Sequence, residues 1–126
     1  IAAMFSLKTA SLILYSEKDN FHEVIPSLEL AYFAFNKKYR ERHPESKGFG
    51  QYFFDVFVCK IVKNVYDLVG CVNLYVFAIN HPKLISVYET LGFIALPAEQ
   101  EAEIIKNISA DTTGGCKFLF MKISNM

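Results

Sequence analysis

The segment from Gln51 to Val69 constrains the fold most, because it has helical periodicity and lies between two strand-like segments. Gly70 follows it directly and predicts a C-terminal helix cap. The flanking segments 27–35 and 71–77 are apolar on both alternating faces, which is typical of buried strands. This order predicts two neighbouring parallel strands joined by a helix. The apolar positions of the helix are Phe53, Phe54, Phe57, Val58, Ile61, Val62, Val65 and Leu68.

The N-terminal part of the chain predicts two strands and then a loop. Residues 5–15 are rich in β-forming residues and end in a polar turn at 16–20. The charged segment 36–50 contains two glycines near its end and predicts a loop that leads into the helix. Strand alternation over 27–35 places Leu28, Leu30, Tyr32 and Ala34 on one face, and Glu29, Ala31, Phe33 and Phe35 on the other.

The C-terminal part predicts a second helix and two more strands. Asn80 is placed to cap a helix with Pro82 in its first turn, and Gly92 ends that helix. We expect a short strand at 93–96, an acidic helix or a loop with helical bias at 98–108, a turn at 111–115 and a final strand at 116–123. The apolar stripe of the helix is Leu84, Ile85, Tyr88 and Leu91.

Length and composition predict one domain over residues 1–126. The 126 residues are 52% hydrophobic and 21% charged, with zero formal net charge. This balance argues against nucleic acid or a membrane surface as a partner, and the high apolar content is compatible with a homodimer. No apolar run reaches the length of a membrane span. Three separated cysteines predict buried free thiols in a reducing compartment, so we expect a cytoplasmic location: Cys59, Cys71 and Cys116.

The segment "SKGFG" before the predicted helix has the placement of an anion-binding loop. Backbone N–H groups at a helix start lie at the positive end of the helix dipole, which suits a phosphate. Gly48 and Gly50 permit close approach to the backbone, and Lys47 adds a cation. The same pattern also begins helices that bind nothing, so both interpretations stay open. The histidines share no metal-ligand spacing, and no metal site is expected.

Together, "ESKGFG" and the later "NHPKLISVYETLGF" resemble the GNAT superfamily of N-acetyltransferases, which use acetyl-coenzyme A. The family's cofactor loop usually has Gln or Arg, then x-x-G-x-G/A, and its late helix ends in a Y-E-x-x-G-F pattern. The resemblance covers mainly residues 25–126. It implies an α/β (α+β) fold with a mixed, mainly antiparallel sheet and helices on both faces. We expect the family's usual N-terminal elements to be short or missing before residue 5.

The resemblance also implies roles for individual residues. Tyr88 would lie beside the thioester sulfur as general acid, although a tyrosine at this spacing is also a common core residue. Asn80 would contact the cofactor, or act only as a helix cap. The backbone of the strand around three residues would pair with the pantetheine arm: Phe33, Ala34 and Phe35. Five loop residues would offer groups to the pyrophosphate: Ser46, Lys47, Gly48, Phe49 and Gly50.

Glu29 matches the place where some relatives hold a general base that acts on the amine through a water, or it faces solvent. The sequence departs from the family at Glu45, where Gln or Arg is usual, and the segment before it is longer than is common. Its "KKYRER" would reach the 3′-phosphate or form a solvated surface. The implied function is acetyl transfer from acetyl-CoA to a small amine, a peptide N-terminus, a lysine or an aminoacylated tRNA. A non-catalytic coenzyme A-binding or structural, interaction module of the same fold is the alternative.

Overall fold

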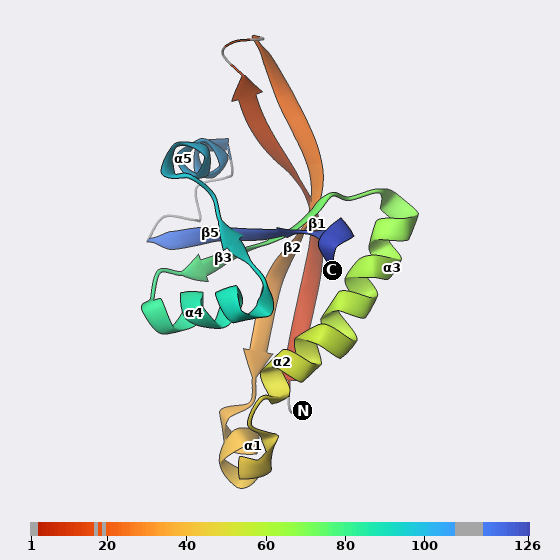
Figure 1. Cartoon of the computed structure of the whole chain (residues 1–126), viewed down its shortest axis with the longest axis vertical. Helices are drawn as coiled ribbons and strands as arrows, with labels where there is room; N and C mark the ends of the chain where they lie inside the picture. The colour runs from red at the N-terminus through yellow and green to blue at the C-terminus, as the bar shows by residue number, and fades with distance from the viewer. Residues whose placement is uncertain (1–2, 17, 19, 108–114) are drawn as a thin grey trace.

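The computed structural model describes residues 3–16, 18, 20–107 and 115–126, and it contains a five-stranded sheet in the order β1-β2-β3-β5-β4 (Figure 1). The β2–β3 pair is parallel and the other three pairs are antiparallel. The expected mixed, mainly antiparallel sheet is therefore confirmed. The strands are β1 (Ala3–Ser16), β2 (Phe21–Phe35), β3 (Asn73–Ile79), β4 (Ile94–Ala95) and β5 (Cys116–Lys122).

Apart from a short helix at Lys37–Arg42, the described helices occur where the sequence predicts them, with differences at their boundaries. A π-helical turn, Phe54–Val58, joins α2 to α3, so the predicted helix is continuous but not uniform. Gly70 ends α3 and Gly92 ends α4, both with left-handed backbone, as predicted. The helices are α1 (Lys37–Arg42), α2 (Phe49–Phe53), α3 (Cys59–Val69), α4 (Pro82–Leu91) and α5 (Ala98–Asn107).

Two local predictions are wrong. The segment after β2 is not an irregular loop: Asn36 caps α1 by accepting a hydrogen bond from the Tyr39 N–H, and a 3-10 turn, Pro44–Ser46, follows. Asn80 does not cap α4, because the helix begins at Pro82 and the preceding residue is His81. The His81 Nδ1 accepts the Lys83 N–H at 3.2 Å. The turn expected at 111–115 lies, except for Gly115, outside the described residues.

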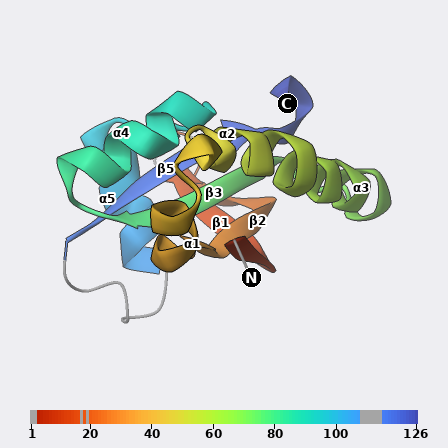
Figure 2. The same ribbon diagram turned by 90° about the horizontal axis from the view of Figure 1, so that it is seen from below.

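Helices cover both faces of the sheet, as expected (Figure 2). The α2–α3 helix and α4 pack on one face, through Phe54, Val62 and Leu91, against the first hydrophobic cluster. The other face carries a second cluster in which Ile104 of α5 packs with Leu12, Tyr75 and Phe118. Alternate side chains of β3 enter the two clusters, so the central strand belongs to both.

Three further properties follow from the described part of the chain. All three cysteines are free, but only Cys71 is buried. Burial, with a contribution from Asp55, raises the pKa of the Cys59 thiol to about 11.

Within residues 3–107 and 115–126, where described, none of the helices has the length and apolar character of a membrane span. The same residues contain no cluster of His, Cys, Asp or Glu arranged to hold a metal ion.

The strands β2 and β3 separate after a short parallel ladder. They pair only from Ser27 with Asn73 to Glu29 with Tyr75, although β2 continues to Phe35 and β3 to Ile79. Figure 1 shows the end of β2 running down toward α1, while β3 runs to the left between β5 and α4. The β3-facing edge of the last part of β2 is therefore not paired with another described strand.

A β-bulge at Ala31 changes the faces predicted for β2. Leu30 pairs with Leu7 and Tyr32 with Ser6, so Ala31 has no partner on β1. One extra residue reverses the alternation beyond it. Phe33 consequently packs with the first cluster, on the same face as Leu30, whereas the sequence placed these two residues on opposite faces.

Candidate functional site

A large pocket lies where β2 and β3 separate, between the end of β2, the segment from α1 to α2, and α4. Its volume is about 710 Å³. It brings together three segments that are distant in the sequence but were predicted to form one site. Of the predicted site residues, the following line it: Phe33, Ala34, Phe35, Lys47, Gly48, Phe49, Gly50 and Tyr88.

The glycines shape the end of the pocket at the start of α2. Gly48 is the N-cap residue with φ of 85°, a left-handed conformation that favours glycine. A Cβ atom at Gly50 would lie 3.3 Å from Cζ of Phe35, so this glycine allows the helix to approach β2 closely. The first N–H groups of a helix have no partner within it, and here they begin at Phe49, beside the pocket.

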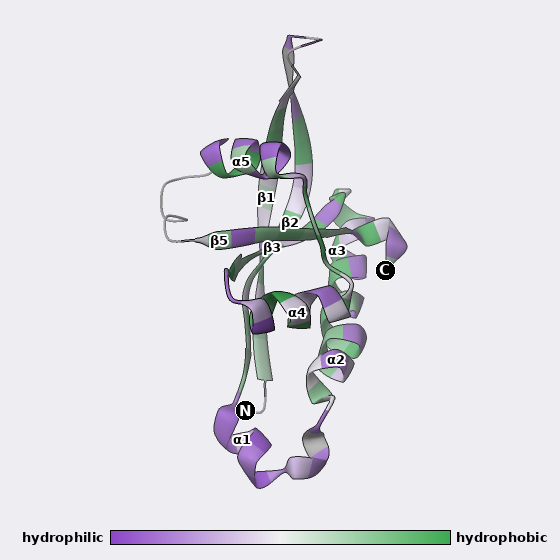
Figure 3. Cartoon of the chain, turned by 60° about the vertical axis from the view of Figure 1, so that its left-hand side comes forward, coloured by the Kyte–Doolittle hydropathy of each residue, from purple (hydrophilic) through white to green (hydrophobic). Residues whose placement is uncertain are grey.

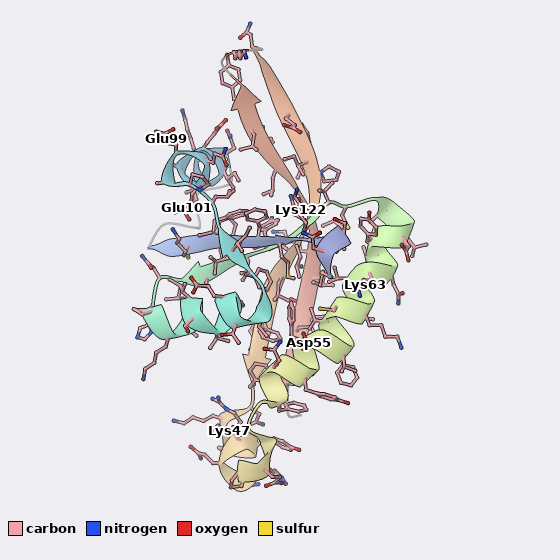
Figure 4. The ribbon with its side chains drawn as sticks, in the orientation of Figure 1. Lys47, Asp55, Lys63, Glu99, Glu101 and Lys122 are labelled. Atoms are coloured by element: carbon pink, nitrogen blue, oxygen red, sulfur yellow. The ribbon has the colours of Figure 1, made fainter. Side chains whose placement is uncertain are left out.

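The charges in this pocket are cationic. Arg40 and Lys47 line it, and no Asp or Glu does so among the described residues. Figure 3 shows that α1, which carries Arg40, is hydrophilic, and Figure 4 shows Lys47 beside this helix. Two cations and a helix start at one end of an otherwise largely apolar pocket are suited to an elongated ligand with an anionic end.

Tyr88 lies at the α4 side of the pocket among aromatic rings. Its ring centroid is 5.6 Å from that of Phe93 and 6.5 Å from that of Phe33. Burial raises the pKa of Tyr88 above its ordinary value. The phenol is therefore protonated at neutral pH, and among the described residues no hydrogen-bond partner occupies its hydroxyl. It is available to donate a proton or a hydrogen bond to a ligand.

Glu29 lies on the opposite face of the sheet from Tyr88. It is the last residue of β2 that pairs with β3, and its partners across the strands are Lys8 and Tyr75. The Lys8 Nζ is 3.7 Å from a Glu29 carboxylate oxygen. Burial, and then the nearby Glu29 carboxylate that accepts its hydrogen bond, raise the pKa of Tyr75. Glu29 is thus held at the point where the two strands separate, behind the pocket.

Three other positions lie apart from the pocket lining or at its border. The backbone N–H of Asn80 donates to the Gly115 carbonyl at 2.9 Å, and Asn80 is exposed at the far end of β3. Ser46 ends the 3-10 turn before Lys47. A Glu45 carboxylate oxygen is 3.0 Å from the His43 Nδ1. A backbone hydrogen bond and then His43 hold the pKa of Glu45 below its ordinary value.

Some lining residues were not predicted as site residues. Leu84 and Leu91 share the apolar stripe of α4 with Tyr88, so their spacing could have predicted that they line the same pocket. Arg40 belongs to the charged segment for which both a phosphate contact and a solvated surface were considered. Gln51 gave no signal, because one polar residue at a helix start has no distinctive pattern. The other lining residues without an assigned role are Tyr39, Pro44, Val87 and Thr90.

No protein-family model matches the sequence, and no curated protein matches it either. Solved structures of bacterial toxins do match. A tyrosine-to-phenylalanine mutant of the toxin AtaT superposes with a TM-score of 0.66 at 20% identity, over 98% of this chain and 59% of that chain. The fold is that of these toxins.

Two further matches have the same architecture. The KacTA–DNA complex has a TM-score of 0.65 at 20% identity, over 98% of this chain and 60% of that one. AtaTR bound with AcCoA has a TM-score of 0.62 at 22% identity, over 99% and 60%. The chain therefore spans less than two thirds of the length of these structures. At 20–22% sequence identity, these matches show that the fold is similar and nothing more.

Proposed function

We propose that this chain binds acetyl-CoA in the pocket between β2 and α4 and transfers the acetyl group to an amine. The observation that carries the proposal is that one pocket joins two cations and a helix start to an unpaired strand edge and Tyr88. A neighbour with the same fold was solved with AcCoA, which supports the choice of ligand.

The phosphate groups bind at the glycine end. Lys47 and Arg40 supply positive charge, and the N–H groups from Phe49 onward supply hydrogen bonds from the positive end of the helix dipole. The departure at Glu45 does not oppose this role, because Glu45 is absent from the described lining and has His43 as its partner. Ser46 is proposed as a further contact at this end, whereas the position of Asn80 gives its cofactor role no support.

The extended arm of the ligand binds along β2. From Phe33 to Phe35 the strand lines the pocket, and its β3-facing edge has no strand partner among the described residues. Backbone N–H and C=O groups on such an edge can pair with an amide-containing chain, as an added strand does. The bulge at Ala31 supports this arrangement, because it directs Phe33 toward the first cluster beside Tyr88.

Acetyl-CoA would supply a thioester carbonyl that an amine can attack. Tyr88 is the proton donor for the departing sulfur, since burial keeps its phenol protonated. Glu29 is proposed as the base that accepts the amine's proton through a water. This assignment requires the amine to approach from the face opposite Tyr88, because the Glu29 carboxylate lies there beside Lys8.

The acceptor and the protein partners are less closely defined by the site. A small amine, a peptide N-terminus, a lysine and an aminoacylated tRNA all carry the required amine. Solved structures of this fold include the KacTA–DNA complex and the toxin AtaT bound to the C-terminus of the antitoxin AtaR. A protein partner, including a second copy of this chain, is therefore also proposed, and location in the cytoplasm is consistent with such a role.

Calorimetric titration with acetyl-CoA tests the cofactor site. Lys47→Glu should weaken binding by about tenfold or more, because it replaces a charge-assisted contact with repulsion. Lys63→Glu is the matched control, since it makes the same charge change on an exposed residue of α3 that does not line the pocket (Figure 4). Equal binding by both variants would reject the site.

Turnover distinguishes the enzyme from a binding module. Release of free coenzyme A thiol should depend on an added amine, and it should be measured across amines of the four acceptor classes. Saturable binding of acetyl-CoA with no amine-dependent release from any class would favour the non-catalytic module. Absence of binding by the folded wild-type chain would reject both functions.

A further inference from the structure

We propose that the α5 face of the sheet contains a second binding site, for a small neutral molecule with an apolar body and a hydrogen-bond donor. The site is a pocket of about 330 Å³ between α5, the outer half of the β1–β2 hairpin and β5. It shares no lining residue with the first pocket and borders the second hydrophobic cluster. The inference does not rest on the proposed acetyl transfer.

The pocket exists because the β1–β2 hairpin continues past the start of the parallel β2–β3 ladder, where it no longer pairs with β3. Pairing between β2 and β3 begins at Ser27, so the part of the hairpin before it extends beyond β3. Leu12, Leu14 and Ile25 line the pocket from this part. Figure 1 shows α5 lying beside the hairpin and above β5. The outer half of the hairpin and β5 thus form two walls of the pocket, and α5 forms the third.

Hydrogen bonds hold α5 in this position from both sides. On the hairpin side, Glu103 accepts the Tyr15 N–H, and the Asn107 Nδ2 donates to the Ile13 carbonyl at 3.3 Å. On the β5 side, Glu101 accepts the Phe118 N–H at 3.3 Å, and its carboxylate is 3.2 Å from the Lys117 Nζ. Figure 4 shows Glu101 on the side of α5 that lies toward β5. Because these contacts fix α5 against the hairpin and β5, the pocket is already formed before a ligand binds.

Asn73 provides the polar recognition. It lines the pocket, is 8% exposed, and its Oδ1 is buried without a hydrogen-bond partner among the described residues. The neighbouring Ser27 hydroxyl does not satisfy it, because that hydroxyl donates to the Ile25 carbonyl at 3.2 Å. Buried polar atoms in folded proteins are nearly always paired, so an unpaired acceptor at a pocket indicates a donor on a ligand.

The remaining lining defines the rest of the ligand. Apolar side chains such as Leu96, Ile104 and Phe118 form most of the surface and suit an aromatic or branched aliphatic body. The two charged lining residues, Glu23 and Lys122, have opposite signs, so together they favour a ligand without net charge. An uncharged aromatic ring that carries one N–H group meets these requirements.

Indole and N-methylindole are the probes for this site, because they differ in the single N–H donor. In an amide chemical-shift titration of the wild-type chain, indole should saturate with shifts in residues 12–14, 23–25 and 104. It should bind at least about fivefold more tightly than N-methylindole. Equal binding of the two probes, or no saturable shifts, would overturn the proposal.

Two variants locate the binding. Asn73→Leu should remove the preference for indole, since it removes the acceptor and keeps a similar volume. If this variant does not fold, Leu14→Trp provides the test, because it fills the pocket from a half-buried lining position and should abolish the indole shifts. Lys47→Glu should leave indole binding unchanged. Saturable indole shifts confined to the first pocket would also contradict the assignment.

Discussion

The Tyr88 hydroxyl is the proposed proton donor of the first pocket. Replacing Tyr88 with Phe keeps the ring contacts with Phe33 and Phe93 but removes the donor. If Tyr88 is the general acid, amine-dependent turnover should fall by about 10²–10⁴-fold while acetyl-CoA affinity and thermal stability change little. The measurements are steady-state kinetics, calorimetry and thermal unfolding of the same preparations.

The pH profile separates this role from a packing role. Because the pKa of Tyr88 is raised, its phenol stays protonated from neutral pH to beyond its ordinary value of about 10. Loss of the wild-type rate through proton donation should therefore begin only above that pH, and Tyr88→Phe should lack this alkaline decrease. Unchanged turnover in Tyr88→Phe would assign Tyr88 to the hydrophobic core alone.

At the scale of elements, the start of α2 depends on the backbone of Gly48. Its φ of 85° is left-handed, and among the described residues no atom outside 47–49 lies within 4 Å of where a Cβ would be. Gly48→Ala should therefore destabilise the fold by about 1 kcal/mol through backbone conformation and not through a clash. Gly48→Asn, which tolerates this conformation better, should lose less. Denaturant unfolding of both variants measures the difference, and equal stability of Gly48→Ala and wild type would refute the strain.

At the scale of the whole molecule, the two hydrophobic clusters should unfold together, because β3 and β5 contribute side chains to both. Ile104 is 2% exposed in the second cluster, so Ile104→Ala should cost about 2–5 kcal/mol. Far-ultraviolet circular dichroism and tyrosine fluorescence should report the same single transition. Ile79→Ala is the control at a position that is 68% exposed and should change stability by less than about 0.5 kcal/mol. Two separate transitions would contradict one domain.

The sequence by itself determined the order and kind of most elements. The helical spacing of 51–69, the glycines that end α3 and α4, and the alternating final strand depend on neighbours in the chain, and the structure agrees with them. The sequence also predicted much of the first pocket, because the glycine segment and the α4 stripe are local patterns. Prediction was weaker at helix starts, where His81 and not Asn80 caps α4.

Only the tertiary structure decided which side chains share a face or a pocket. The bulge at Ala31 is defined by the partner strand, so alternation within β2 could not show that Phe33 lies with Tyr88 while Glu29 lies on the other face. The short ladder between β2 and β3 likewise created both pockets. Arg40 and the unpaired Asn73 oxygen acquire their significance from segments that are distant in the chain. The physical reason is that strand pairing and burial are non-local interactions, whereas periodicity and helix termination are local ones.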